Sequence, residues 1–196
     1  MTGTDTGVGK TLVACALLRA YAGRGLRVVG MKPVTCGAEP GGSGLVDDDV
    51  ERLIAAGNVS APREHVNPYC FWPPIAPHIA ARQVGVSISF DRIEDSFRAL
   101  AARAQVVVVE GVGGFRVPLG PGLDTVQLAA RLALPVVLVV GMRLGCLNHA
   151  LLTAEAIIVG IAASYMVGVN LLGIEGAYYL AYINRYTEPT DVVIGL

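Results

Sequence analysis

The sequence predicts a single-domain α/β protein, residues 1–196, with a mostly parallel β-sheet flanked by helices. The length of 196 residues, with 53% hydrophobic and 16% charged residues, suits one domain with a well-buried core. Short runs of four to six apolar residues, many of them β-branched, lack the alternation of a half-buried strand. Helical patterns separate these runs, as in a parallel sheet covered on both faces.

The order of the expected elements follows from these patterns. Strands are expected at residues 26–31, 106–109, 136–140, 165–169 and 192–194. Helices are expected near residues 11–22, 48–56, 90–103, 125–132, 148–159 and 177–185. Glycine-rich residues 41–44 and proline-rich residues 73–77 are expected to form loops within the domain.

The uncharged stretch at residues 156–174 is 19 residues long, close to the shortest membrane-spanning helix. Glycines and polar residues interrupt it, and no basic cluster flanks it. We therefore expect a helix that ends near Gly160, then a buried strand at 165–169, and no membrane association.

Charge and cysteine usage argue against several classes of protein. A formal net charge of -1 leaves no basic excess for general binding to nucleic acid or to anionic membranes. The four cysteines form no C-x-x-C pair and the histidines lack zinc-type spacing, so we expect reduced thiols in the cytoplasm. The first residues show neither the basic segment nor the apolar core of a secretory signal.

Residues 3–11 read Gly-Thr-Asp-Thr-Gly-Val-Gly-Lys-Thr and lead directly into an expected apolar helix. In a phosphate-binding loop, glycines let the backbone fold around phosphate oxygens, while the helix N-terminus and a lysine supply positive charge. The outer glycines are separated by five residues rather than four, so this is a variant loop. The sequence therefore predicts an ATP-binding, P-loop NTPase-like domain with Gly7, Val8, Gly9, Lys10 and Thr11 at the nucleotide.

Glu110 directly follows the apolar run 106–109, where a buried strand would deliver a carboxylate to the sheet edge. Mg²⁺ takes a few hard oxygen ligands and keeps several waters, so the Thr11 hydroxyl, Glu110 and one more carboxylate suffice. Asp49, in the acidic cluster 47–49, is the expected third ligand, and the alternative is that this cluster only caps a helix. The adjoining glycines at 111–114, among them Gly111 and Gly113, permit close approach of the backbone to substrate or phosphate.

Polar residues follow the expected strands: Lys32, Glu110 and Asn170 each come directly after an apolar run. Because ligands bind outside the carboxyl ends of strands in open α/β sheets, we expect one shared site there. Lys32 could be a solvated surface charge. Beside a triphosphate, however, it is expected to be a catalytic cation, together with Lys10.

Several motifs in a fixed order resemble the dethiobiotin synthetase family, and the similarity runs from residue 3 to about residue 155. Beyond the phosphate loop it rests on Lys32-Pro33-Val34, Asp49, Asn67-Pro68-Tyr69, Ala76-Pro77-His78, residues 109–114, Pro118-Leu119 and residues 144–149.

This resemblance implies a cytoplasmic, homodimeric ligase of biotin biosynthesis that uses ATP and Mg²⁺. Its small-molecule substrates would be 7,8-diaminononanoate, carbon dioxide and ATP. A carbamate formed on one amine would attack the γ-phosphate, and the second amine would then close a ureido ring. No covalent enzyme intermediate is needed, so the protein would contribute positioning and charge stabilisation.

The resemblance also implies roles for individual residues. Lys10 and Lys32 would stabilise the phosphoryl group and the carbamate, and Thr11, Asp49 and Glu110 would hold Mg²⁺. Residues implied to contact the substrate are Thr6, Lys32, Cys36, Gly111, Gly145, Cys146, Leu147 and Asn148, the last four at the substrate carboxylate across the dimer interface. Residues implied to contact the nucleotide are Gly7, Val8, Gly9, Lys10, Thr11, Glu110, Gly113 and Asn170, with Asn170 at the adenine.

The chain departs from the family pattern in three places. Only Met1 and Thr2 precede Gly3, where the family has an apolar first strand. Cys36 stands where the family has a serine or threonine hydroxyl near the substrate. The match fades after about residue 160.

Three other classes of protein are alternatives. A switch ATPase of the partition or division type shares this fold but carries an additional lysine early in the loop, where this chain has residues 4–6 without lysine. An amide-forming ligase of cobalamin synthesis is normally much longer. A pure binding module would not need Lys32, Glu110 and a magnesium shell together.

Overall fold

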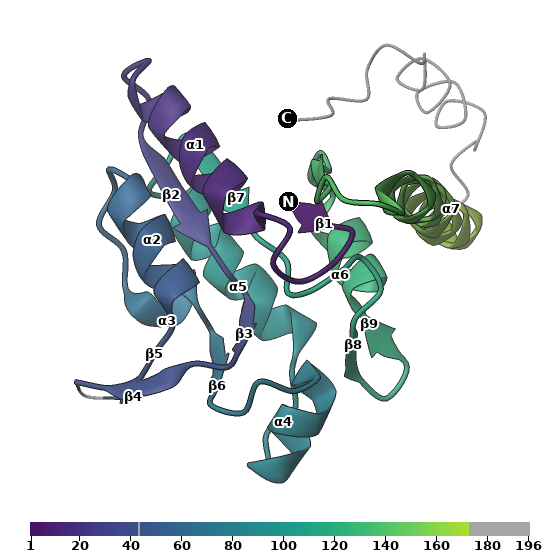
Figure 1. Ribbon diagram of the computed structural model, residues 1–196, viewed down its shortest axis with the longest axis horizontal. Coiled ribbons are helices and arrows are strands. Elements are labelled where there is room, and N and C mark those ends of the chain that lie inside the picture. Colours follow the sequence, from purple (N-terminus) through teal and green to yellow (C-terminus); the bar gives the residue numbers. More distant parts are fainter. Residues whose placement is uncertain (43, 173–196) are drawn as a thin grey trace.

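The computed structural model describes residues 1–42 and 44–172, and it shows an α/β architecture (Figure 1). Its central pair of strands is parallel: β2 (Val28–Met31) lies beside β7 (Val106–Val109), with Val28 opposite Val106. Helices α1 (Lys10–Ala22) and α2 (Asp48–Ala56) cover one face of this pair, and α5 (Phe90–Ala101) covers the other. The predicted fold class is confirmed.

Alternate residues of β2 enter two separate cores, which explains its unbroken apolar sequence. Val28 packs with Ala14 and Leu18 of α1, whereas Val29 and Met31 pack with the core that includes α5. A strand buried on both faces has no polar positions, as expected for a parallel pair inside a helical cover.

The remaining strands among the described residues are short. Two further pairs are parallel: β1 (Thr2–Gly3) with β10 (Leu138–Val139), and β3 (Val34–Cys36) with β6 (Tyr69–Phe71). Two are antiparallel: β4 (Glu39–Gly41) with β5 (Gly44–Val46), and β8 (Pro118–Gly120) with β9 (Leu123–Asp124).

Met1 and Thr2 connect β7 to β10 through main-chain hydrogen bonds. The Gly111 N–H donates to the Met1 carbonyl at 3.0 Å, and the Thr2 N–H donates to the Val137 carbonyl at 2.9 Å. This arrangement holds the phosphate-binding loop, residues 3–11, beside the carboxyl end of β7.

Capping residues set the starts of several helices. The Asp47 carboxylate accepts a hydrogen bond from the Val50 N–H at the start of α2. At the start of α6 (Thr125–Leu132), Asp124 and Gln127 form a reciprocal capping box. These are the helices whose predicted bounds, 48–56 and 125–132, agree with the structure. Two shorter helices, α3 (Arg63–Val66) and α4 (Pro77–Gln83), complete this part of the chain.

The prediction for the last described segment is wrong. Helix α7 (Cys146–Leu172) continues through Gly160, so the structure has no strand at residues 165–169. An apolar run without alternation fits a buried strand and a helix equally well. Gly160 serves close packing instead of ending the helix, because a Cβ placed there would lie 2.5 Å from Cγ1 of Val126 in α6.

The expected helix at 177–185 and the expected strand at 192–194 lie outside the described residues. Over the described part of the chain, no helix combines the length and apolar character needed to cross a membrane.

Candidate active site

A cavity of about 610 Å³ opens at the carboxyl ends of β2, β3 and β7. Its walls come from the phosphate-binding loop, the start of α2 and the segment 110–114. The predicted site residues that line it are Thr6, Gly7, Gly9, Lys10, Thr11, Lys32, Cys36, Asp49, Glu110, Gly111 and Gly113. Strands that run parallel end at the same edge of the structure, which is why residues so distant in sequence meet here.

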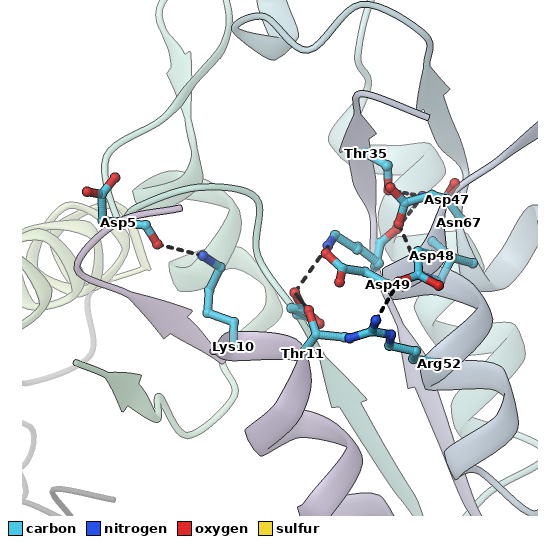
Figure 2. A network of polar contacts seen from close by, with 12 residues as sticks. Asp5, Lys10, Thr11, Thr35, Asp47, Asp48, Asp49, Arg52 and Asn67 are labelled. Carbon is cyan, nitrogen blue, oxygen red and sulfur yellow. Dashed lines mark hydrogen bonds and ion pairs between the residues drawn. The ribbon is translucent and has the colours of Figure 1, made fainter. Parts of the chain in front are cut away.

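The loop at residues 3–11 has the backbone conformation that its glycines permit. Gly7 and Gly9 have φ angles of 74° and 98°, in the left-handed region that favours glycine. Gly9 immediately precedes α1, so the N-terminus of that helix faces the cavity. The Nζ of Lys10 donates to the Asp5 carbonyl at 2.8 Å, which holds the ammonium within the loop (Figure 2). Burial lowers the pKa of Lys10.

Lys32, at the end of β2, forms ion pairs with two carboxylates. Its Nζ lies 3.1 Å from Oε1 of Glu110 and also contacts Oδ2 of Asp49. The Thr11 hydroxyl donates to the same Glu110 oxygen at 2.8 Å. Four elements therefore meet at one polar cluster: β2, β7, α1 and α2.

Burial and charge act in opposite directions on this cluster. Burial alone would lower the pKa of Lys32, but the Glu110 carboxylate and the Asp49 contact raise it above its usual value. Burial raises the pKa of Glu110, and the Lys32 charge only partly opposes this. For Asp49, the hydrogen bond and the charge of Lys32 outweigh burial, so the pKa is lowered. Lys32 is therefore held as a cation between the two acidic groups.

The oxygens of this cluster fit a hard divalent cation. Glu110 is 1% exposed, and its Oε2 atom is buried without a hydrogen-bond partner among the described residues. A buried carboxylate oxygen with no donor is costly unless something else satisfies it. Two carboxylates and the Thr11 hydroxyl suit Mg²⁺, which keeps several waters of its own. The described residues contain no group of three or more histidine, cysteine or acidic side chains that could hold a metal ion.

Cys36 lines the cavity from β3. Burial raises the pKa of its thiol to about 11, so the group stays protonated at neutral pH. A protonated thiol is a weak hydrogen-bond donor and a poor nucleophile. Cys36 can therefore contact a substrate without reacting with it.

Several predicted site residues lie away from this cavity. Gly145 has a φ of 91° and precedes α7, and Cys146, Leu147 and Asn148 form the start of that helix. None of these residues lines the cavity, and the Leu147 side chain is 76% exposed.

Two predicted nucleotide contacts also differ from the expectation. Val8 belongs to the loop but does not line the cavity. Asn170 was expected at the end of a strand, and that position is wrong because residue 170 lies in the continuous helix α7. Its side chain lies outside the described part of the structure.

The loop after β10 is nevertheless tied to the phosphate-binding loop. The guanidinium of Arg143 lies 2.6 Å from Oδ2 of Asp5. This ion pair brings the segment that leads into α7 next to residues 3–11.

The structure adds residues that sequence reasoning missed. Arg52 lines the cavity from α2, one turn after Asp48, with which it forms an ion pair at 2.6 Å. The helical spacing of Arg52 after the acidic cluster was the available signal. Pro74 and Ile75 form an apolar wall, and that wall could not be assigned from a proline-rich loop alone.

Comparison with known proteins agrees with this geometry. Residues 1–174 match the family described as the AAA domain. A protein named ATP-dependent dethiobiotin synthetase from Nitrosospira multiformis is 57% identical over 157 residues, covering 80% of this chain and 68% of that protein. The chain belongs to the dethiobiotin synthetase family.

Two more family members show the same extent of similarity. The proteins of that name from Aromatoleum aromaticum and Ralstonia nicotianae are 55% and 54% identical over 157 residues. Each match covers 80% of this chain, and 70% and 69% of the respective relatives. The resemblance found in the motifs is therefore confirmed, and with it a P-loop ligase that depends on ATP. The matches favour neither a switch ATPase nor a ligase of cobalamin synthesis.

Proposed function

We propose that the chain closes the ureido ring of dethiobiotin from 7,8-diaminononanoate, carbon dioxide and ATP, in the presence of Mg²⁺, as a step of biotin biosynthesis. The observation that carries this proposal is the position of Lys32. Its ammonium lines the same cavity as the phosphate-binding loop but comes from the end of β2, so it would approach a bound triphosphate from another side than Lys10.

Lys10 and Lys32 would have different roles in the reaction. Lys10, held inside the loop, would bind the triphosphate before and during the reaction. Lys32 would stabilise the charge that develops when a carbamate oxygen attacks the γ-phosphorus and the bond to ADP breaks. These are the only two lysines in the sequence, whereas thirteen basic residues are arginines. The compact charge of lysine suits a phosphoryl group that moves during the reaction.

The ring closes in a second step. The other amine attacks the carbon of the carbamic–phosphoric anhydride, inorganic phosphate leaves, and the amine loses a proton. Burial keeps the Cys36 thiol protonated, and the one hydroxyl–carboxylate pair described in the cavity, Thr11 with Glu110, is assigned to the metal site. This supports direct transfer between substrates without a covalent enzyme intermediate.

Thr11, Asp49 and Glu110 would hold the Mg²⁺ ion. The bound ion would neutralise charge on the β- and γ-phosphate oxygens. The buried, unpartnered Oε2 of Glu110 supports this assignment. Thr6, Cys36 and Gly111 would contact the diamine, since they line the same cavity.

We also propose that the enzyme is a cytoplasmic homodimer, as the family resemblance implies. The start of α7, residues 145–148, would then receive the substrate carboxylate of the partner subunit. This would explain why these residues do not line the cavity of their own chain. Large apolar side chains are exposed in this region, namely Met142, Leu144, Leu147 and Leu151. Asn170 would contact the adenine.

The test is phosphate release from ATP with 7,8-diaminononanoate and bicarbonate, each omitted in turn. We expect release to require both compounds and Mg²⁺, and labelled bicarbonate to appear in the ring product. Equal hydrolysis of ATP without the diamine would contradict the ligase function and favour a switch ATPase.

A further inference from the structure

Asn67 is a buried polar residue that lies behind the cavity wall without lining the cavity. It follows α3 and is 7% exposed. Its Nδ2 lies within hydrogen-bond distance of three oxygens: the Lys32 carbonyl at 2.6 Å, the Thr35 hydroxyl at 3.1 Å and the Tyr69 carbonyl at 3.2 Å. Figure 2 shows the Asn67 and Thr35 side chains next to each other.

These neighbours determine the orientation of the amide. Two of the three oxygens are carbonyls, which can only accept hydrogen bonds, so the NH₂ group must face them. The other amide atom, Oδ1, is buried with no hydrogen-bond partner among the described residues. The side chain of Asn67 is therefore held in place through its donors.

The first consequence concerns Lys32. Its carbonyl accepts from Asn67, and its own N–H donates to the Val66 carbonyl at 2.8 Å. Both main-chain polar groups of Lys32 are thus bound to the same two-residue segment. Lys32 also precedes Pro33, which restricts its backbone further. A backbone fixed in this way sets the point from which the Lys32 side chain reaches Glu110 and Asp49.

The second consequence concerns Thr35. This residue is 1% exposed, and it lines the cavity from β3. Because its hydroxyl oxygen accepts from Asn67, its hydrogen can be donated to a group inside the cavity. One amide therefore orients a cation and a hydroxyl on the same wall.

We propose that Asn67 is a positioning residue for phosphoryl transfer, acting through Lys32 and Thr35. This inference rests on the proposed function, since it assigns Asn67 to the step that Lys32 stabilises. Asn67 does not approach the phosphate-binding loop, so it acts on the transition state and leaves the ground-state binding of ATP unchanged.

The same strand provides a control at an exposed asparagine that also binds it through side-chain hydrogen bonds. Asn58 binds the opposite end of β2: its Nδ2 donates to the Leu26 carbonyl at 2.9 Å, and its Oδ1 accepts from the Val28 N–H at 2.8 Å. Substitution of either asparagine removes side-chain hydrogen bonds to β2 or its flanking residues. Only the substitution of Asn67 removes hydrogen bonds at the end of β2 that carries Lys32.

The experiment compares the Asn67→Ala, Asn67→Asp and Asn58→Ala variants of the full chain. Aspartate keeps the shape of asparagine and lacks its donors. Turnover is normalised to the ATP-binding sites titrated in each preparation, so unfolded chain does not count as lost activity. We expect both Asn67 variants to lose roughly 10- to 100-fold in kcat, as for groups that support a catalytic residue. The Kd for ATP should stay unchanged, and Asn58→Ala should keep its kcat.

A double-mutant cycle tests whether Asn67 acts through Lys32. In the Lys32→Gln background, Asn67→Ala should have little further effect on kcat beyond its contribution through Thr35. A merely structural role predicts multiplicative losses. The inference is overturned if the Asn67 and Asn58 variants lose turnover equally, or if Asn67→Ala causes its full loss of kcat in the Lys32→Gln background.

A measurement that does not depend on catalytic turnover tests this inference separately from the proposed function. Because the chain has two lysines, selective ¹³C labelling of lysine gives two side-chain signals. Asn67→Asp should increase the mobility of the Lys32 signal and leave that of Lys10 unchanged. An inactive wild-type chain would contradict the proposed function, whereas an unchanged Lys32 signal would contradict the inference. If Asn67→Ala binds no ATP, Asn67→Asp, which lacks the donors, takes its place in the comparison and in the double-mutant cycle.

Discussion

The Nζ of Lys32 lies 3.1 Å from Oε1 of Glu110, an oxygen that also accepts the Thr11 hydroxyl at 2.8 Å. One carboxylate oxygen therefore joins the end of β2 to the start of α1, although Thr11 and Glu110 are far apart in the chain. The second oxygen of Glu110 makes no hydrogen bond among the described residues. This division leaves the second oxygen available for the Mg²⁺ ion proposed here.

Replacement of Lys32 and replacement of Lys10 should have different effects on kcat and on the Kd for ATP. Lys32→Gln removes a charge that acts mainly in the transition state, so kcat should fall by about a hundredfold or more while the Kd for ATP changes little. Lys10→Gln should impair both quantities, because Lys10 lies within the phosphate-binding loop. Steady-state turnover and equilibrium ATP binding measure the difference. Near-normal turnover in the Lys32 variant would remove it from the catalytic step.

Replacement of Glu110 should weaken the use of Mg²⁺. Glu110→Gln keeps the shape and removes the charge, so the Mg²⁺ concentration for half-maximal activity should rise roughly 10- to 100-fold. Asp48→Asn is the control, since Asp48 lies in the same acidic cluster as Asp49 but is 77% exposed and pairs with Arg52. The control should need no more Mg²⁺ than the wild type. The same Mg²⁺ dependence in both variants would end the assignment of Glu110.

The thiol of Cys36 should be slow to alkylate at moderate pH. Burial raises its pKa from 9.0 to about 11, so the thiolate at pH 8 is about a hundredfold scarcer than in an ordinary cysteine. Labelling by iodoacetamide, followed by peptide mass spectrometry, should accelerate as the pH rises toward 11. The unfolded chain is the control and should label at the ordinary rate. Rapid labelling of folded Cys36 at pH 8 would contradict its burial.

Gly160 should resist replacement even though it lies inside a helix. Alanine favours a helix over glycine by about 1 kcal/mol, but a Cβ at this position would lie 2.5 Å from the buried Val126 side chain. Gly160→Ala should therefore lower the free energy of unfolding. Val126→Ala should relieve this clash. The double variant should therefore lose less free energy of unfolding than the two single variants lose together. Additive effects would show that α7 and α6 do not pack at Gly160.

Local sequence was sufficient for the elements whose signals are local. The bounds of α2 and α6 agree with prediction because Asp47 and Asp124 cap these helices through residues two or three positions away. Strands β2 and β7 lie within the predicted runs, since burial on both faces requires an unbroken apolar sequence. Because parallel strands end at the same edge, the sequence also predicted that Lys32 and Glu110 lie close together.

Other features depend on contacts between distant residues, and only the tertiary structure decided them. Helix α7 continues past Gly160, and that glycine packs against Val126 of α6, a contact that leaves no mark on the sequence around residue 160. The ion pair of Lys32 with Glu110 and the hydrogen bond of Asn67 to the Lys32 carbonyl join residues 78 and 35 positions apart. A sequence pattern reports the period at which side chains repeat, whereas the direction of a buried side chain is set by whichever groups pack around it. The sequence alone therefore determined the fold class, the phosphate-binding loop and the family, and tertiary packing determined how the charged groups pair.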